Sequence, residues 1–98
     1  MLLKHYTKTK KKCRVTFKYP NHEQAGSAVL AGGFNGWSVT DTPMNRLKDG
    51  SFSVTLSLKA NCSYTFRYVL DGTHWVNDPA ADEYAANEYG ESNSVVIL

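Results

Sequence analysis

Cysteine and histidine are scarce in this chain, and the few that occur are scattered. Its two cysteines, Cys13 and Cys62, form no CxxC pair. The three histidines lie far apart and have no metal-ligand spacing: His5, His22 and His74. Zinc sites need clustered thiols and imidazoles, and disulfide-stapled domains need several cysteines. We therefore expect no metal, no cofactor and two free thiols, which fit a reducing compartment.

Long apolar runs are also missing. No stretch approaches the ~20 residues that a membrane-spanning helix requires, and the first twelve residues contain lysines but no apolar core of a signal peptide. We expect a cytoplasmic protein with no membrane partner. Its 98 residues, 42% of them hydrophobic, suffice for one folded domain with a modest core.

The net charge of +2 conceals an asymmetry along the chain. Six lysines and arginines fall within the first fourteen residues, whereas residues 71–98 contain six acids and no lysine or arginine. Residues 1–12 thus form a basic N-terminal arm ahead of a domain over residues 13–98. Such an arm can contact nucleic acid or anionic lipid, or it can charge an edge strand and discourage aggregation. We favour the second interpretation, with no nucleic-acid partner, because only Tyr6 is interleaved with the lysines.

Alternating apolar and polar residues mark the strands. Residues 51–58, SFSVTLSL, give the cleanest case, and similar runs bounded by turn residues predict strands at residues 13–19, 27–32, 64–70 and 93–98. The acidic, alanine-rich residues 80–91 are expected to form at most one helical turn, with Asp78 as N-cap and Pro79 in the first helical position. Short strands and regular turns predict an all-β fold, an immunoglobulin-like antiparallel β-sandwich of about seven strands.

The stretch FRYVLDGTHWVNDP, residues 66–79, combines a strand, a tight turn and a short returning strand that carries Trp75. In a two-residue turn, Trp75 would face Tyr68 and join the buried side of the sheet. A three-residue loop would instead set Val69 opposite Trp75 and place the indole on the face of Arg67, because one residue of register moves every side chain to the other face. The first register makes Trp75 a core residue. The second makes it part of an exposed aromatic and cationic surface.

Two more aromatic residues lie in the turn GGFNGWS, residues 32–38. Three glycines and an asparagine within residues 32–36 indicate that the backbone turns sharply here. We expect Phe34 to pack inside the sandwich, while Trp37, on the flank of the loop, is free to lie outside.

Four stretches together, VLAGGFNGWS, DGSFSVTLSL, FRYVLDGTHWVNDP and GESNSVVIL, resemble the early-set carbohydrate-binding module of family 48. That module precedes the catalytic domain in isoamylases and glycogen-branching enzymes and is the glycogen-binding domain of the AMP-activated protein kinase β subunit. The resemblance covers residues 13–98. The tryptophan of FNGWS followed by LDG-x-x-W-x-x-DP is its most specific part.

The resemblance implies an α-glucan site made of residues from separate stretches. Trp37 and Trp75 match the two tryptophans of the family, and Asn93 matches its asparagine at the start of the last strand. Arg67 stands where the family has lysine, which keeps the charge and changes the geometry. Tyr89, just before Gly90 in the sequence, matches an apolar residue that reaches through the sugar ring in some members.

Three kinds of function follow from these patterns. The resemblance implies a non-catalytic module that binds α-1,4-linked glucan such as glycogen. The alternative is a regulatory or docking domain that binds a protein partner or a second copy, with an exposed apolar patch away from the tryptophans. An enzyme would need a carboxylate pair for glycoside hydrolysis. We do not expect this chain to be one, because a small sandwich lacks an enclosing cleft. The carboxylates available for such a pair are Asp71, Asp78, Asp82 and Glu83.

Overall fold

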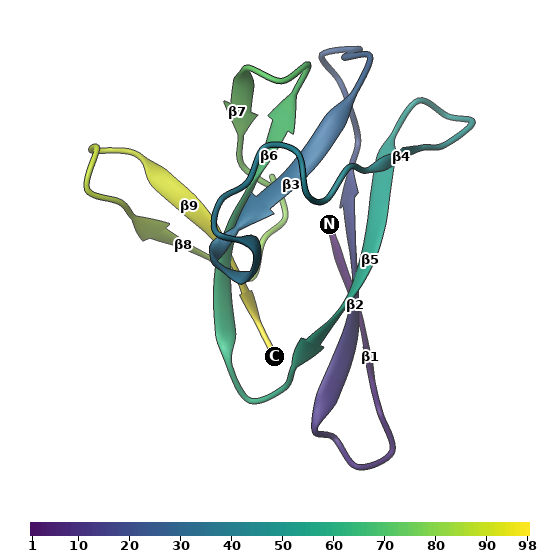
Figure 1. The fold of residues 1–98 in the computed structure, drawn as a ribbon, viewed down its shortest axis with the longest axis vertical. Helices are drawn as coiled ribbons and strands as arrows, with labels where there is room; N and C mark the ends of the chain where they lie inside the picture. The colour runs from purple at the N-terminus through teal and green to yellow at the C-terminus, as the bar shows by residue number, and fades with distance from the viewer.

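The computed structural model describes residues 1–98 and shows two antiparallel β-sheets packed face to face (Figure 1). The strands are β1 (Leu2–Tyr6), β2 (Lys12–Tyr19), β3 (Ala28–Gly32), β4 (Asn45–Arg46), β5 (Phe52–Lys59), β6 (Ser63–Leu70), β7 (His74–Val76), β8 (Glu83–Ala86) and β9 (Ser92–Ile97), and one 3-10 helix, η1, spans Gly33–Asn35. One sheet has the order β1-β2-β5-β4 and the other β3-β6-β9-β8, with β7 also paired to β6. The predicted all-β, immunoglobulin-like sandwich is confirmed, with nine strands instead of about seven.

Aromatic residues from both sheets fill the space between them. Phe17 of β2 meets Phe66 of β6 edge to face, with ring centroids 5.0 Å apart, and the rings of Tyr19 and Tyr68 lie 5.1 Å apart. Along β2, every second residue is buried and the residues between are more exposed. The alternation in the sequence therefore sorts the apolar side chains into the core, as predicted.

Residues 2–6, expected to belong to a basic arm ahead of the domain, instead form β1. This strand pairs with β2 from Leu2 opposite Phe17 to Tyr6 opposite Cys13. It buries little apolar surface, since only Leu2 packs partly against the core. Main-chain pairing and the ion pair between Lys4 and Asp82, at 2.6 Å, hold it in place. No period-2 apolar pattern accompanies such a strand, so the sequence does not reveal it.

Residues 80–91 form no helical turn, where the sequence predicted at most one. Glu83–Ala86 forms β8, which pairs with the free edge of β9, because tertiary pairing overrides the weak helical propensity of a short segment without an apolar face. Asp78 does not cap a helix. It is fully buried, and its carboxylate accepts hydrogen bonds from the Tyr68 hydroxyl at 2.7 Å and the Ala80 amide at 2.8 Å.

Candidate functional site

Trp75 occupies the outer face of the second sheet. It lies opposite Val69, and His74 lies opposite Leu70, so the loop between β6 and β7 contains three residues. Asp71 and Gly72 both have positive φ, 50° and 77°, which gives this loop its tight reversal. The structure thus adopts the second of the two registers, and Trp75 shares a face with Arg67.

The Asp71 side chain fixes this loop against a neighbouring segment. Its Oδ1 accepts hydrogen bonds from the backbone amides of Gly26, at 2.9 Å, and Ser27, at 3.2 Å. The Asp71 amide in turn donates to the Ser27 carbonyl at 2.9 Å. These bonds tie the turn to the segment that leads into β3, so the register that exposes Trp75 is supported from outside the hairpin.

Trp37 reaches the same surface from the turn after β3. Asn35 shapes this turn, because its side chain accepts a hydrogen bond from the Gly32 amide at 3.1 Å and donates one to the Leu30 carbonyl at 2.9 Å. Gly32 has no space for a side chain, since a Cβ there would lie 2.6 Å from the Thr65 carbonyl oxygen. Trp37 itself has a φ of 60°, a left-handed conformation that is strained for an aromatic residue.

The turn separates its two aromatic residues as the sequence predicts. Phe34 packs against the core, with its ring centroid 5.9 Å from that of Phe17 and 6.1 Å from that of Tyr64. Trp37 points outward instead, and its ring centroid lies 6.5 Å from that of Trp75, with 40° between the two planes. The two indoles therefore form one bent aromatic surface.

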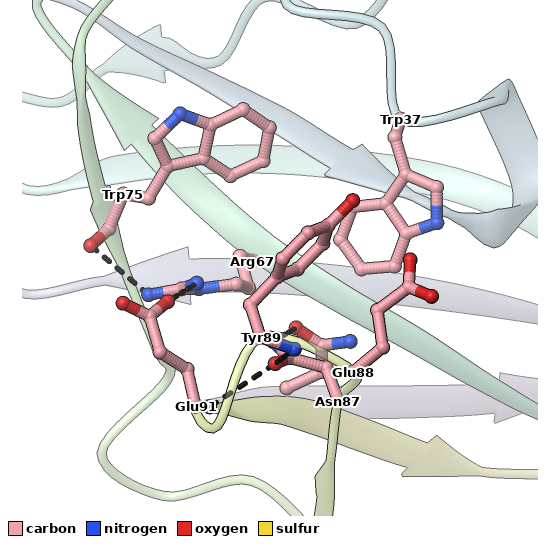
Figure 2. Close-up of a pocket in the computed structure, with 8 residues that line it drawn as sticks. Trp37, Arg67, Trp75, Asn87, Glu88, Tyr89 and Glu91 are labelled. Atoms are coloured by element: carbon pink, nitrogen blue, oxygen red, sulfur yellow. Dashed lines mark hydrogen bonds and ion pairs between the residues drawn. The ribbon is translucent and has the colours of Figure 1, made fainter.

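An open groove of about 910 Å³ runs between these indoles and the loop that joins β8 to β9. Figure 2 shows the side chains of Trp37, Trp75 and Tyr89 around it. Tyr89 lies at the tip of that loop and is 81% exposed. All five site residues predicted from the sequence line the groove: Trp37, Arg67, Trp75, Tyr89 and Asn93.

Arg67 is held firmly within the groove. Its Nη1 donates to Glu91 Oε2 at 2.8 Å and its Nη2 donates to the Trp75 carbonyl at 3.2 Å (Figure 2). The Arg67 side chain is 14% exposed, whereas that of Glu91 is 62% exposed. The Nε of Arg67 is buried and has no hydrogen-bond partner, so the guanidinium retains unused donor capacity.

Three further groove residues were missed by the sequence analysis: Asn87, Glu88 and Glu91. Asn87 organises the loop, because its Oδ1 accepts hydrogen bonds from the amides of Tyr89, at 3.0 Å, and Glu91, at 3.1 Å. Its Nδ2 also contacts Asn93 Oδ1 at 3.3 Å. An asparagine three positions before Gly90, which has a φ of 79°, is a hairpin signal. This signal did not lead to a predicted hairpin, because no strand was expected before it within residues 80–91.

The carboxylates considered for a catalytic pair have structural partners elsewhere. Asp71 binds the loop before β3, Asp78 is buried, and Asp82 pairs with Lys4 and accepts from the Ile97 amide at 2.7 Å. None of these three, nor Glu83, lines the groove. Burial and the adjacent Asp78 carboxylate also raise the pKa of Tyr68, which therefore stays protonated in the core.

Two further features bear on ligands. No three side chains of His, Cys, Asp or Glu come together in a way that could hold a metal ion, and both cysteines are free thiols. No helix in the structure combines the length and the hydropathy of a membrane span.

The fold and the groove together define a β-sandwich with an open aromatic groove on the outer face of one sheet. No protein-family model and no curated protein sequence match the chain. Among solved structures, it is similar to part of the enterobactin esterase FES from Shigella flexneri, crystallised in the presence of 2,3-dihydroxy-N-benzoyl-glycine, with a TM-score of 0.77 and 12% identity. The match covers 99% of this chain and 32% of the esterase, so the chain spans about a third of that protein. At this identity the likeness concerns the fold alone.

Proposed function

We propose that this chain is a non-catalytic α-glucan-binding module, similar to the early-set carbohydrate-binding modules of family 48, and that its groove takes α-1,4-linked chains of the glycogen or starch type. The observation that carries the proposal is the bent pair of indoles, Trp37 and Trp75, on one open groove with Arg67. Its two free thiols fit the cytoplasm as the proposed location.

The indoles suit the apolar part of a glucan. A pyranose ring presents a face of C–H groups, and a flat, electron-rich indole of large area complements that face. Consecutive rings of an α-1,4 chain follow a curve, so two indole planes inclined by 40° can each stack on a ring. A flat β-1,4 chain would match only one of the two planes. Tyr89, at the tip of the facing loop, offers a third aromatic surface to the same chain.

The polar residues suit the hydroxyl rim of the sugars. Sugar hydroxyls both donate and accept hydrogen bonds. Arg67 uses one N–H of Nη1 and one of Nη2 for Glu91 and the Trp75 carbonyl, so the other Nη hydrogens remain to donate to a hydroxyl. Asn93 accepts from Asn87 through its Oδ1, which leaves its amide nitrogen to donate to a hydroxyl. These groups would fix the orientation of a chain that the indoles hold.

The groove is preformed and open, so binding would order few side chains but would bury only one side of the ligand. An open site with two stacking residues is expected to give a binding free energy of about −4 to −5.5 kcal/mol, or a Kd of about 0.1–1 mM. Avidity from several modules or from a partner would raise the effective affinity for a polymer.

The test is a titration of intrinsic tryptophan fluorescence with maltoheptaose and with β-cyclodextrin. A saturable change is expected for the wild type and is expected to be lost in both Trp37→Ala and Trp75→Ala, with the fold monitored by circular dichroism. Tyr6→Ala, at an exposed aromatic position outside the groove, serves as the matched control. Cellohexaose tests the preference for a curved chain. No response to either α-glucan at millimolar concentration would refute the proposal and direct the search to a protein partner.

A further inference from the structure

The positive and negative charges of the side chains that line the groove do not cancel. Arg67 contributes one positive charge, and Glu88 and Glu91 contribute two negative ones, so the groove carries a net charge of −1. Glu91 pairs with Arg67 at 2.8 Å. Glu88 belongs to none of the ion pairs in the protein. A ligand in this groove therefore meets one unpaired carboxylate and no unpaired cation.

From this imbalance we infer that the groove selects uncharged glucan chains and rejects chains that carry carboxylates or phosphate esters, with Glu88 and Glu91 as the specificity-determining residues. The inference rests on the proposed glucan function and adds the charge class of the ligand. An arginine in a sugar groove is ordinarily the natural partner of an anion, because its planar donor fork matches carboxylate and phosphate. In this groove the Arg67 guanidinium is already hydrogen-bonded to the carboxylate of Glu91.

The two glutamates act in different ways. Glu91 neutralises Arg67 and, together with the Trp75 carbonyl, orients the guanidinium, so Arg67 serves as a hydrogen-bond donor without being a free cation. Glu88 repels an incoming anion directly. Both glutamate side chains are exposed, so salt screens their effect. An anionic group on the ligand is expected to weaken binding about tenfold at low salt, and less at high salt.

The test compares three oligosaccharides of the same length by calorimetry. The first is maltoheptaose, the second has one primary hydroxyl oxidised to a carboxylate, and the third has that carboxylate converted to the neutral amide. The amide matches the carboxylate in size, so a difference between them reports charge alone. We expect the amide to bind like maltoheptaose and the carboxylate to bind about tenfold more weakly, with a gap that narrows at high salt.

Three variants assign the effect to residues. Glu88→Gln is expected to recover most of the affinity for the carboxylate probe, and Glu91→Gln is expected to make that probe bind at least as well as the amide, because it frees Arg67. For each variant the quantity compared is the ratio of its Kd for the carboxylate probe to its Kd for the amide probe, so that a general change in glucan affinity cancels. Glu83→Gln removes an exposed carboxylate that does not line the groove and should change nothing.

The outcomes separate the two proposals. Equal binding of the carboxylate and the amide by the wild-type protein would overturn the charge selectivity and leave glucan binding standing. A charge preference that Glu83→Gln removes as well as Glu88→Gln would also overturn it, since the effect would then come from the whole protein. Absence of binding by all three oligosaccharides would overturn both proposals.

Discussion

Inserting one glycine between His74 and Trp75 is expected to destroy the groove without removing any residue that lines it. The three-residue loop of residues 71–73 sets Trp75 opposite Val69. With that loop kept, the inserted glycine takes the position opposite Val69, and the indole moves to the core face, opposite Tyr68. That face has no room, because Tyr68 is fully buried among other aromatic rings. The indole would leave the groove whether β7 re-paired in the new register or detached.

The magnitude follows from one lost stacking surface. An indole on a pyranose ring removes about 80 Å² of apolar surface from water, which at about 25 cal/mol per Å² is worth about 2 kcal/mol. The Kd for maltoheptaose should therefore rise about thirtyfold. Forcing the indole against the core would cost about 1–3 kcal/mol, and each kcal/mol lowers the Tm of a domain of this size by about 4–8 °C.

Calorimetry with maltoheptaose and a thermal melt would measure both effects. Thr73→Gly keeps the loop length and is the matched control, with affinity expected to match the wild type. A folded insertion variant that binds as tightly as the wild type would refute the register argument. If the insertion variant does not fold, deletion of His74 shifts Trp75 opposite Leu70, also on the core face, and tests the same reasoning.

Three other perturbations have defined outcomes. Trp37→Gly should be more stable than Trp37→Ala by about 1 kcal/mol in chemical denaturation, because the φ of 60° strains alanine and not glycine. Arg67→Lys should weaken maltoheptaose binding about threefold to tenfold in calorimetry, since an ammonium cannot reproduce the two directed bonds of the guanidinium. Although burial opposes it, the hydrogen bond from the Ile97 amide and the Lys4 ammonium lower the pKa of Asp82 below its ordinary 3.8. This carboxylate thus contributes stability above about pH 4 that is lost on further acidification. In chemical denaturation at a series of pH values, Asp82→Asn should make the free energy of unfolding fall less steeply on the acid side (the acid limb).

Each of these predictions has a control within the chain. At Tyr84, in the extended backbone of β8, glycine should be less stable than alanine, which is the reverse of the order at position 37. Arg46→Lys, away from the groove, should leave binding unchanged. Asp41→Asn, at an exposed carboxylate outside all ion pairs, should leave the acid limb as steep as in the wild type. The opposite result at any control would contradict the corresponding explanation.

Strands that bury one face were predictable, and strands held mainly by main-chain pairing were not. β2 and β5 carry alternating apolar residues, and the core selects that pattern. β1 and β8 bury little, so their sequences resemble a basic arm and an acidic linker. β4 is two residues long and carries no pattern at all. Only the presence of a free sheet edge decides that these segments become strands.

The site could be predicted as a set of residues but not as a geometry. The likeness to family 48 selected Trp37 and Trp75, yet the sequence permitted two registers for the β6–β7 loop. The choice depends on hydrogen bonds from Asp71 to a segment more than forty residues earlier, which no local pattern reveals. Glu91 was not selected because its role, the ion pair with Arg67, also joins distant parts of the chain.

The residues that break local rules converge on the groove, and this supports its functional role independently of any likeness to a family. The other non-glycine residues with positive φ are Lys10, Asn21, Gln24, Asn61 and Asp71, all polar, whereas Trp37 is aromatic and has the same conformation. The one buried side-chain nitrogen without a partner belongs to Arg67, also in the groove. Such strain and unmet hydrogen bonding reduce stability, and proteins tolerate them chiefly where a ligand makes use of them. A glucan chain stacked on the indoles would use the left-handed conformation that brings Trp37 to the groove.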